Sequence, residues 1–283
     1  MLQLSIIMAA RDLKSAKKDK NDEFYTQLND IQLELRYYKE YFKGKVVFCN
    51  CDDPYESNFF KYFALNFNAF GLKKLIATCY SPSPIAGIEL NLFEDNTMPE
   101  TVKKAYKIEI TEVSDVNNDG AIDLADVEFL LKNNKNVLTL LNGSGDFRSV
   151  ECKELLQHAD IVVTNPPFSL FREFVDLLIK FDKQFLIIGN TSAVKYKTIF
   201  PLFVENKIKI GINCDEKYFQ IPKDYTSERS VVKNGINYVR HRNTRWFTNI
   251  PYSVKKHIDC SNLQSDYQKY DNYNAIEISR ITN

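Results

Sequence analysis

Short apolar runs alternate with amphipathic stretches along the chain up to about residue 205. Each run is bounded by polar or turn-forming residues, which is typical of buried strands, and the runs cover 45–50, 73–80, 106–113, 161–164 and 183–190. Apolar residues between the runs recur at helical spacing and predict helices over 27–43, 55–67, 150–157, 168–180 and 195–204. This alternation indicates an α/β fold in which helices cover both faces of a mostly parallel sheet.

The pattern changes after residue 205. Short, aromatic, strand-like segments follow with turns between them, at 207–213, 216–222, 236–241 and 244–250. The last segment, 261–279, is polar and rich in Tyr and Asn. We therefore predict a larger domain at 1–205 and a small C-terminal β-rich region at 206–283.

Composition places the 283-residue chain among ordinary globular proteins, with 44% hydrophobic residues and a formal net charge of zero. No apolar run approaches the ~18 residues of a membrane-spanning helix, and the opening segment is interpreted as the start of a helix rather than a signal peptide. The six cysteines lack the spacing of a zinc or redox motif. We expect a cytoplasmic protein without membrane association.

Basic residues gather in one stretch despite the neutral total. Residues 229–258 contain no acid, and aromatic residues lie among the basic ones, which are Arg229, Lys233, Arg240, Arg242, Arg245, Lys255 and Lys256. Such clustering suggests a surface that contacts phosphates, whereas the alternative is an ordinary solvated surface with Trp246 and Phe247 in the core. If 236–242 is extended, Arg240 and Arg242 share a face.

The strand at 161–164 ends in Asn165, Pro166, Pro167 and Phe168. Two prolines cannot donate to a sheet ladder, so they end the strand and keep a short extended loop rigid. Open α/β folds bind ligands in such loops at the carboxyl ends of strands. The Asn165 amide oxygen and the Pro166 carbonyl can accept both hydrogens of an exocyclic amino group, and Phe168 can stack on its ring. The competing interpretation is a loop that only ends a strand.

A second polar loop, which includes Asp52 and Asp53, follows the first strand and opens a helix. It resembles the Asp-Pro-x-x-Gly-Ser-Gly-x-Phe turn with which amino-methyltransferases hold S-adenosylmethionine. The matches are Asp53, Pro54 and Ser57, and the departures are Glu56 and Asn58 in place of glycines. A loop without glycine must approach the cofactor less closely or use a different turn. Alternatively, the two aspartates cap the helix.

Together, the segments 20–26, 45–63, 145–149, 160–175 and 245–249 resemble the EcoRI-type adenine-specific DNA methyltransferases, over about residues 15–250. This resemblance implies a Rossmann-like methyltransferase sheet and the cofactor S-adenosylmethionine. It further implies an enzyme that methylates N6 of a flipped adenine at a specific sequence in double-stranded DNA, and we expect it to act as a monomer.

The resemblance also implies the site residues. Those expected to bind the cofactor are Tyr25, Thr26, Asn50, Asp52, Asp53 and Asp146. Of these, Tyr25 and Thr26 would line the methionine end, and Asp146 would lie near the adenine. Asn50, Asp52 and Asp53 would lie near the methionine and the ribose. Those expected to hold the target base are Asn165, Pro166, Pro167 and Phe168. One departure concerns the ribose: methyltransferases usually carry an acid after the second strand, and here that strand ends without a carboxylate at 77–84.

Two other functions remain open at this point. The same kind of loop methylates other planar amino groups, such as guanine in RNA or glutamine in proteins. The chain could also be a catalytically silent, calcium-dependent nucleic-acid-binding module. For Tyr25 the structural alternative is packing in the core.

The segment 115–126 fits the calcium-loop pattern, with Asp115, Asn117, Asp119, Gly120, Asp123 and Asp126 at the expected spacing. The alternative is an Asx-rich turn that caps a helix beginning near Leu124. A strand rather than a helix is expected before this segment, unlike in an EF-hand. We therefore expect no metal in the catalytic site.

Overall fold

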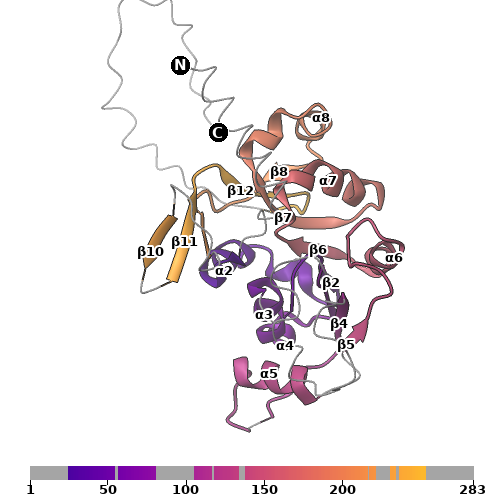
Figure 1. The fold of residues 1–283 in the computed structure, drawn as a ribbon, viewed down its shortest axis with the longest axis vertical. Coiled ribbons are helices and arrows are strands. Elements are labelled where there is room, and N and C mark those ends of the chain that lie inside the picture. The colour runs from indigo at the N-terminus through magenta and orange to yellow at the C-terminus, as the bar shows by residue number, and fades with distance from the viewer. Residues whose placement is uncertain are drawn as a thin grey trace, which may run out of the picture. The chain divides into compact units, whose positions relative to one another are not determined.

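An eight-stranded sheet forms the centre of the described structure (Figure 1). Its strands follow the spatial order β5-β4-β3-β2-β6-β7-β12-β8. Their bounds are β2 Val46–Cys49, β3 Lys74–Thr78, β4 Tyr106–Ile110, β5 Leu138–Leu140, β6 Ile161–Thr164, β7 Gln184–Asn190, β8 Lys209–Ile210 and β12 Thr244–Thr248. The structure is a computed structural model, and it describes residues 25–54, 57–80, 105–116, 118–133, 138–215, 217–220, 230–233 and 236–252. All of these lie in one unit, Met1–Tyr252.

The pairing in this sheet is mixed, so the expectation of a mostly parallel sheet is wrong. Parallel pairs join β2 to β3, β2 to β6 and β6 to β7. The strands β4, β5, β12 and β8 all pair antiparallel. Apolar runs do not reveal strand direction, but β4 alternates buried and half-buried side chains, which suits an antiparallel strand with one face toward solvent.

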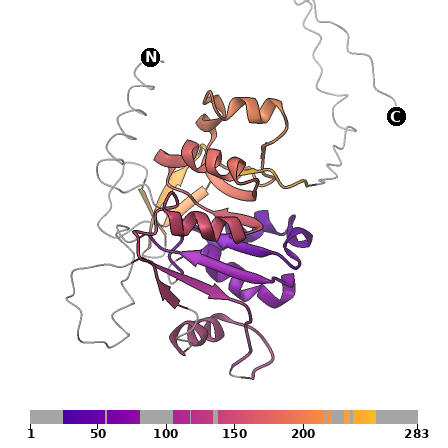
Figure 2. The ribbon, with the colours of Figure 1, turned by 90° about the vertical axis from the view of Figure 1, so that its right-hand side faces the viewer.

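Helices cover both faces of the sheet, as predicted (Figure 1, Figure 2). One face packs against α2 Leu28–Leu35, η1 Lys39–Phe42, α3 Asn58–Leu65, α4 Phe67–Phe70 and α5 Leu124–Asn133. The other packs against α6 Val150–His158, α7 Phe171–Lys180, η4 Thr191–Lys195 and α8 Phe200–Val204. Of the helices described, none is long and apolar enough to cross a membrane.

A second, four-stranded antiparallel sheet has the order β1-β9-β11-β10. Its strands are β1 Tyr25–Thr26, β9 Lys217–Gln220, β10 Ser230–Lys233 and β11 Ile236–His241. In the pairing of β1 with β9, Thr26 lies opposite Phe219. The segment predicted to bind the cofactor is therefore part of a sheet whose other strands come from the C-terminal half of the chain.

Most predicted elements of the first two hundred residues are confirmed, with shorter bounds. The helix predicted over 27–43 is interrupted after α2, where the chain turns before η1. Strands from both sides of residue 205 pair in both sheets, as β12 does with β7 and β1 with β9. The division at residue 205 stays a prediction. The strand predicted over 236–241 is confirmed as β11. The condition that 236–242 is extended is not met, because Arg242 lies in the turn that follows β11.

Candidate active site

The two loops singled out by the sequence meet at one edge of the sheet. Asn50 directly follows β2 and Asn165 directly follows β6, and these strands are parallel neighbours. Because parallel neighbours end at the same edge, the predicted cofactor loop and the predicted base-binding loop lie side by side.

Thr164, the last residue of β6, joins the two loops. Its buried hydroxyl lies within hydrogen-bonding distance of the Asn50 carbonyl oxygen and of Asp52 Oδ2. The other carboxylate oxygen of Asp52 accepts a hydrogen bond from the Ser57 hydroxyl at 2.9 Å. Asp52 therefore connects Thr164, the residue before Asn165, to Ser57 at the start of α3. As a result, the position of the loop after β6 depends on the position of the loop after β2.

Asn50 shapes the turn that follows β2. Its side-chain oxygen accepts hydrogen bonds from the Thr78 hydroxyl and from the Cys51 N–H, both at 2.9 Å. Cys51 adopts a left-handed conformation with φ 66°, which is uncommon for a residue other than glycine. The loop thus makes a tight turn without the glycines of the methyltransferase motif, held by a buried amide.

The helix that follows begins with a Ser57 cap rather than with either aspartate. The Ser57 hydroxyl accepts from the Phe59 N–H at 3.1 Å, in addition to its bond to Asp52. The Asp53 carboxylate instead accepts a hydrogen bond from the Tyr106 hydroxyl at 2.7 Å. Tyr55 and Glu56 of this loop lie outside the described residues.

Asp146 lies in the turn before α6 and is held by Arg148. Arg148 Nε and Nη2 donate to the two carboxylate oxygens at 2.9 and 2.7 Å, and Nη1 reaches Glu173 of α7 at 3.1 Å. These hydrogen bonds hold the pKa of Asp146 below its ordinary value. The carboxylate therefore stays an anion and an acceptor of hydrogen bonds.

The loop after Asn165 lies close to the second sheet. Pro166 is buried, and Phe168 starts the short helix η3 Phe168–Leu170. The Phe168 ring meets the rings of Phe219 and His241 nearly at right angles, with centroids 6.4 and 6.1 Å away. The predicted base-binding loop thus packs against the same sheet that contains Thr26.

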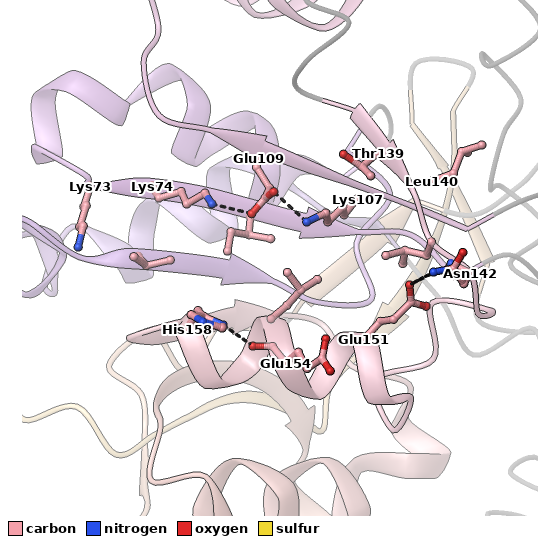
Figure 3. A pocket seen from close by; sticks show the side chains of 14 residues that line it. Lys73, Lys74, Lys107, Glu109, Thr139, Leu140, Asn142, Glu151, Glu154 and His158 are labelled. Carbon is pink, nitrogen blue, oxygen red and sulfur yellow. Dashed lines mark hydrogen bonds and ion pairs between the residues drawn. The ribbon is translucent and has the colours of Figure 1, made fainter.

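A groove of about 650 Å³ lies away from these loops, between α6 and the β3–β4–β5 part of the sheet (Figure 3). Its floor carries Lys74 and Lys107, which both form ion pairs with Glu109. On its α6 side, Glu151 accepts hydrogen bonds from Asn142 and from the Gly143 N–H. None of the predicted site residues lines this groove, and Lys74, Lys107 and Glu109 within it are paired with one another.

The loop 115–126 forms a turn that bonds to itself, although Asn117 lies outside the described residues. The Asp115 carboxylate accepts from the Gly120 N–H at 2.8 Å, and Asp126 accepts from Val116 and Asp123 N–H groups at 2.8 and 2.9 Å. Helix α5 begins at Leu124 and a strand, β4, precedes the loop, as predicted. These contacts favour the Asx-turn interpretation.

Comparison with known proteins identifies the family. The family model described as adenine-specific methyltransferase EcoRI matches residues 12–283. The chain belongs to this family. It is an S-adenosylmethionine-dependent, adenine-specific DNA methyltransferase, and the alternatives of RNA guanine, protein glutamine or a silent binding module are not favoured.

The relatives of this methyltransferase are type II enzymes. The chain is 42% identical over 279 residues to the type II methyltransferase M.EcoRI of Escherichia coli, which covers 95% of this chain and 78% of the relative. It is 36% identical to M.MgeORF184P of Mycoplasma genitalium, with 95% and 75% covered, and 36% identical to M.MpnI of Mycoplasma pneumoniae, with 94% and 74% covered. No solved structure matches.

The residues of this methyltransferase fit a nucleoside cofactor with an amino-acid end. The buried Thr26 Oγ1 has no hydrogen-bond partner within the described part of the chain, as expected of a hydroxyl that serves a ligand. Its neighbour Tyr25 is placed only by its backbone, which pairs with Gln220. Carboxylates at Asp53 and Asp146 supply acceptors for hydroxyl and amino groups.

Several residues at this edge were not anticipated. Thr164, Thr78 and Tyr106 look like ordinary strand residues in the sequence, because each continues the apolar pattern of its strand. The position of Thr164 directly before Asn165 was the one available signal. Phe219 and His241 come from distant segments, and only the pairing of β9 with β11 brings them to Phe168.

The basic stretch is only partly described. Arg240 is half-buried in β11, and the Arg245 guanidinium donates to the carbonyls of Arg242 and Thr244. Trp246 and Phe247 are fully buried, so the alternative that places them in the core is confirmed. The side chain of Lys233 and all of Arg229, Lys255 and Lys256 lie outside the described residues.

Proposed function

We propose that Asn165, Pro166, Pro167 and Phe168 hold a flipped adenine of double-stranded DNA for N6 methylation. In the same proposal, Tyr25, Thr26, Asn50, Asp52, Asp53 and Asp146 form the cofactor site. We also propose that the enzyme works in the cytoplasm and acts as a monomer.

One observation carries the proposal. The Thr164 hydroxyl contacts both Asn50 and Asp52 and lies one residue before Asn165. A methyl acceptor held at Asn165 would therefore lie next to whatever occupies the loop after β2. Direct transfer of a group between two bound molecules requires this proximity, because the reacting atoms must come within about 3–3.5 Å of each other.

The chemistry follows from hydrogen-bond acceptors. The Asn165 Oδ1 atom and the Pro166 carbonyl accept the two amino hydrogens of adenine, which leaves the nitrogen lone pair out of the ring plane. When bound, S-adenosylmethionine supplies an electrophilic methyl group. The nitrogen loses its proton readily after alkylation, so the residues need only orient the base and stabilise positive charge as it develops on nitrogen. Phe168 offers its ring for stacking, and its contacts with Phe219 and His241 fix its orientation.

Replacing Asn165 tests the proposal. Asn165→Ala should lower kcat by roughly a hundredfold or more, as removal of one preorganised hydrogen-bonding group does in other enzymes. Its affinity for S-adenosylmethionine, measured by calorimetry, should change little, because the amide acts chiefly in the transition state.

Asn190→Ala is the matched control. Asn190 ends the neighbouring strand β7, and its side chain caps η4 through the Ser192 N–H at 2.9 Å. This variant should keep near-normal kcat. A turnover of Asn165→Ala within a few-fold of the wild type would overturn the catalytic assignment.

A further inference from the structure

The described end of β3 lacks the acid that usually reads the cofactor ribose. The strand ends at Thr78 and continues into Cys79 and Tyr80, none of which carries a carboxylate. In folds of this kind an acid near the end of the second strand accepts hydrogen bonds from the ribose hydroxyls. Another carboxylate must therefore reach this point if the enzyme recognises the ribose in the same place.

The carboxylate of Asp53 reaches it from the neighbouring loop. Tyr106, the first residue of β4, is bonded to Cys79 by its backbone: Cys79 N–H donates to the Tyr106 carbonyl at 3.1 Å, and Tyr106 N–H donates to Cys79 Sγ at 3.3 Å. The Tyr106 hydroxyl then donates to Asp53 Oδ1 at 2.7 Å. Burial raises the pKa of the Cys79 thiol to about 12, and the negative charge of Asp53 adds to this rise. The Asp53 carboxylate is therefore close enough to the end of β3 to act on Cys79.

Asp53 is held from two sides. Its carbonyl oxygen accepts the Ser57 N–H at 2.6 Å, which fixes the backbone against the start of α3. Its side chain is fixed by a tyrosine with 0% of its surface exposed. A carboxylate has about four acceptor positions, and the phenol takes one of them. The arrangement therefore fixes the orientation of the carboxylate.

The second acid of the predicted nucleoside site flanks the same point. Gly145, directly before Asp146, has φ 75°, and a β-carbon there would collide with the Cys79 carbonyl oxygen. The turn with Asp146 therefore packs directly on Cys79, and Asp53 approaches Cys79 by way of Tyr106. Ribose and adenine are bonded directly to each other, so acceptors for the two parts should flank a single point in this way.

We infer that Asp53 accepts hydrogen bonds from the ribose hydroxyls of S-adenosylmethionine, and that Tyr106 is the positioning residue that holds this carboxylate over the end of β3. The inference rests on the proposed function, because it requires the cofactor to bind at this edge. The inference explains why the buried residue 106 is Tyr rather than Phe, because its hydroxyl orients the Asp53 carboxylate of a different loop.

The test compares the binding of two ligands to the wild type, to Tyr106→Phe, to Asp53→Ala and to the double variant, with a control variant beside them. The ligands are S-adenosylhomocysteine and its 2′,3′-dideoxyribose analogue, and calorimetry measures Kd for the full-length chain. The wild type should bind the hydroxylated ligand at least tenfold more tightly. Tyr106→Phe should weaken binding of that ligand by roughly threefold to tenfold, the loss of one net hydrogen bond, and leave binding of the dideoxy analogue unchanged. In Asp53→Ala, adding Tyr106→Phe should cause no further loss.

Tyr38→Phe is the matched control. Tyr38 is equally buried, and its hydroxyl donates to the Glu34 carboxylate at 2.9 Å, away from the predicted site. Both single tyrosine variants should fold, as judged by cooperative thermal unfolding. Only Tyr106→Phe should reduce the ratio of the Kd of the dideoxy analogue to the Kd of S-adenosylhomocysteine. In steady-state assays its KM for S-adenosylmethionine should rise by more than its kcat falls.

Three results would overturn the inference. The first is a wild type that binds both ligands equally, and the second is a Tyr106→Phe variant that weakens both by the same factor, as a merely structural role would. The third is a Tyr106→Phe variant that binds both ligands as tightly as the wild type does. These results differ from failure of the proposed function, which would appear as a wild type that binds neither ligand or as an active Asn165→Ala.

Discussion

A single hydroxyl, that of Thr164, connects the two halves of the proposed active site. It is fully buried, and it contacts an acceptor on each of Asn50 and Asp52. A buried acceptor that loses its donor costs more free energy than the hydrogen bond itself contributes. The side chain therefore matters for stability and for the alignment of the two loops.

Thr164→Val keeps the shape and removes the hydroxyl. It should lower the free energy of unfolding by about 1–3 kcal/mol, because the one O–H hydrogen that Asn50 and Asp52 share as acceptors is lost. It should also lower kcat, because Asn165 is no longer aligned with the loop after β2. Urea unfolding and methylation assays measure the two effects.

Thr248→Val separates stability from alignment. Thr248, the last residue of β12, is also fully buried, and its hydroxyl donates to the carbonyl of Phe185 in β7 at 2.7 Å. A similar loss of stability with normal kcat is expected for this variant. If the two variants had equal activity, Thr164 would be a structural residue only.

The hydrogen bonds between Arg148 and Asp146 should make the stability of the protein depend on pH in the acid range. Its hydrogen bonds lower the pKa of Asp146 from the ordinary value of 3.8. A lowered folded-state pKa contributes stability that is present above the unfolded pKa and is lost as pH falls through the folded one. Arg148→Gln should therefore be less stable than the wild type near neutral pH, and the difference should shrink below about pH 3.8.

Arg36→Gln is the control for this effect. Arg36 is exposed, and its guanidinium donates to the Tyr37 hydroxyl rather than to an acid. Thermal unfolding at a series of pH values should show no acid-dependent difference from the wild type for this variant. A difference for Arg148→Gln that does not change with pH would contradict the assignment of the shift to Arg148.

At the scale of elements, the loop before α5 shows how an apparent metal motif can serve a helix. Asp126 is almost fully buried, and it accepts N–H groups of Val116 and Asp123. Asp119, by contrast, is exposed and accepts the N–H of Ala121. Within the described residues no group of three or more His, Cys, Asp or Glu is arranged to hold a metal ion.

Asp126→Ala should lower the free energy of unfolding by about 1–3 kcal/mol, because two backbone N–H groups lose their acceptor. Asp119→Ala should change it by about 0.5 kcal/mol or less, as surface substitutions usually do. Thermal unfolding of the wild type should be the same with a chelator and with calcium. A melting temperature that rises with calcium would instead support a metal site in this loop.

The sequence predicts those elements whose pattern is local. The strands β2, β6 and β7 and the helix α7 follow from apolar runs and helical spacing. The direction of β4 was not anticipated, although the alternation of Lys107 and Glu109 with apolar residues was a signal for an antiparallel strand. The two-residue strand β1 is too short for any periodicity and exists only because β9 pairs with it.

The candidate site was predictable to a similar degree. Asn165 and Asp53 stand in motifs that polar residues make visible beside a strand. Tyr106 and Thr164 were hidden, because their side chains continue the strand pattern and their roles depend on hydrogen bonds to distant loops. Short-range pattern therefore finds the residues that we propose to bind the ligands, and it misses the residues that form hydrogen bonds to their loops.

At the scale of the whole molecule, the segments after residue 205 contribute to both sheets. The strand β12 pairs with β7 along five residues, and it places Trp246 in the core. The strands β9 and β11 bring Phe219 and His241 to Phe168. The basic side chains of this region thus extend from a framework that is continuous with the proposed active site.

If Arg240 and Arg242 contact DNA phosphates, replacing both with Ala should weaken binding to all sequences similarly. It should also flatten the dependence of log affinity on log salt by roughly 1.8, the value for two phosphate contacts. Arg36→Ala, an exposed arginine outside the basic stretch, should leave the slope unchanged. Filter binding with cognate and random DNA measures both quantities.

Loss of affinity for cognate DNA alone would mean that these arginines read bases instead. An unchanged affinity and slope on both DNAs would remove them from the interface. Since β11 ends at His241, the two arginines lie on a strand and on the turn after it, so their single variants need not have equal effects.

The pairing of Thr26 with Phe219 has a consequence for how the enzyme is made. A ribosome makes Phe219 about 190 residues after Thr26, so the strand with the predicted cofactor residue cannot be completed until that length of chain has been synthesised. Contacts so far apart in sequence also form slowly, because a long loop must close before they contribute. Newly made chains should therefore pass through a stage in which the central sheet is folded and methylation has not begun. The delay between synthesis and activity should then be set by the strands that are synthesised last.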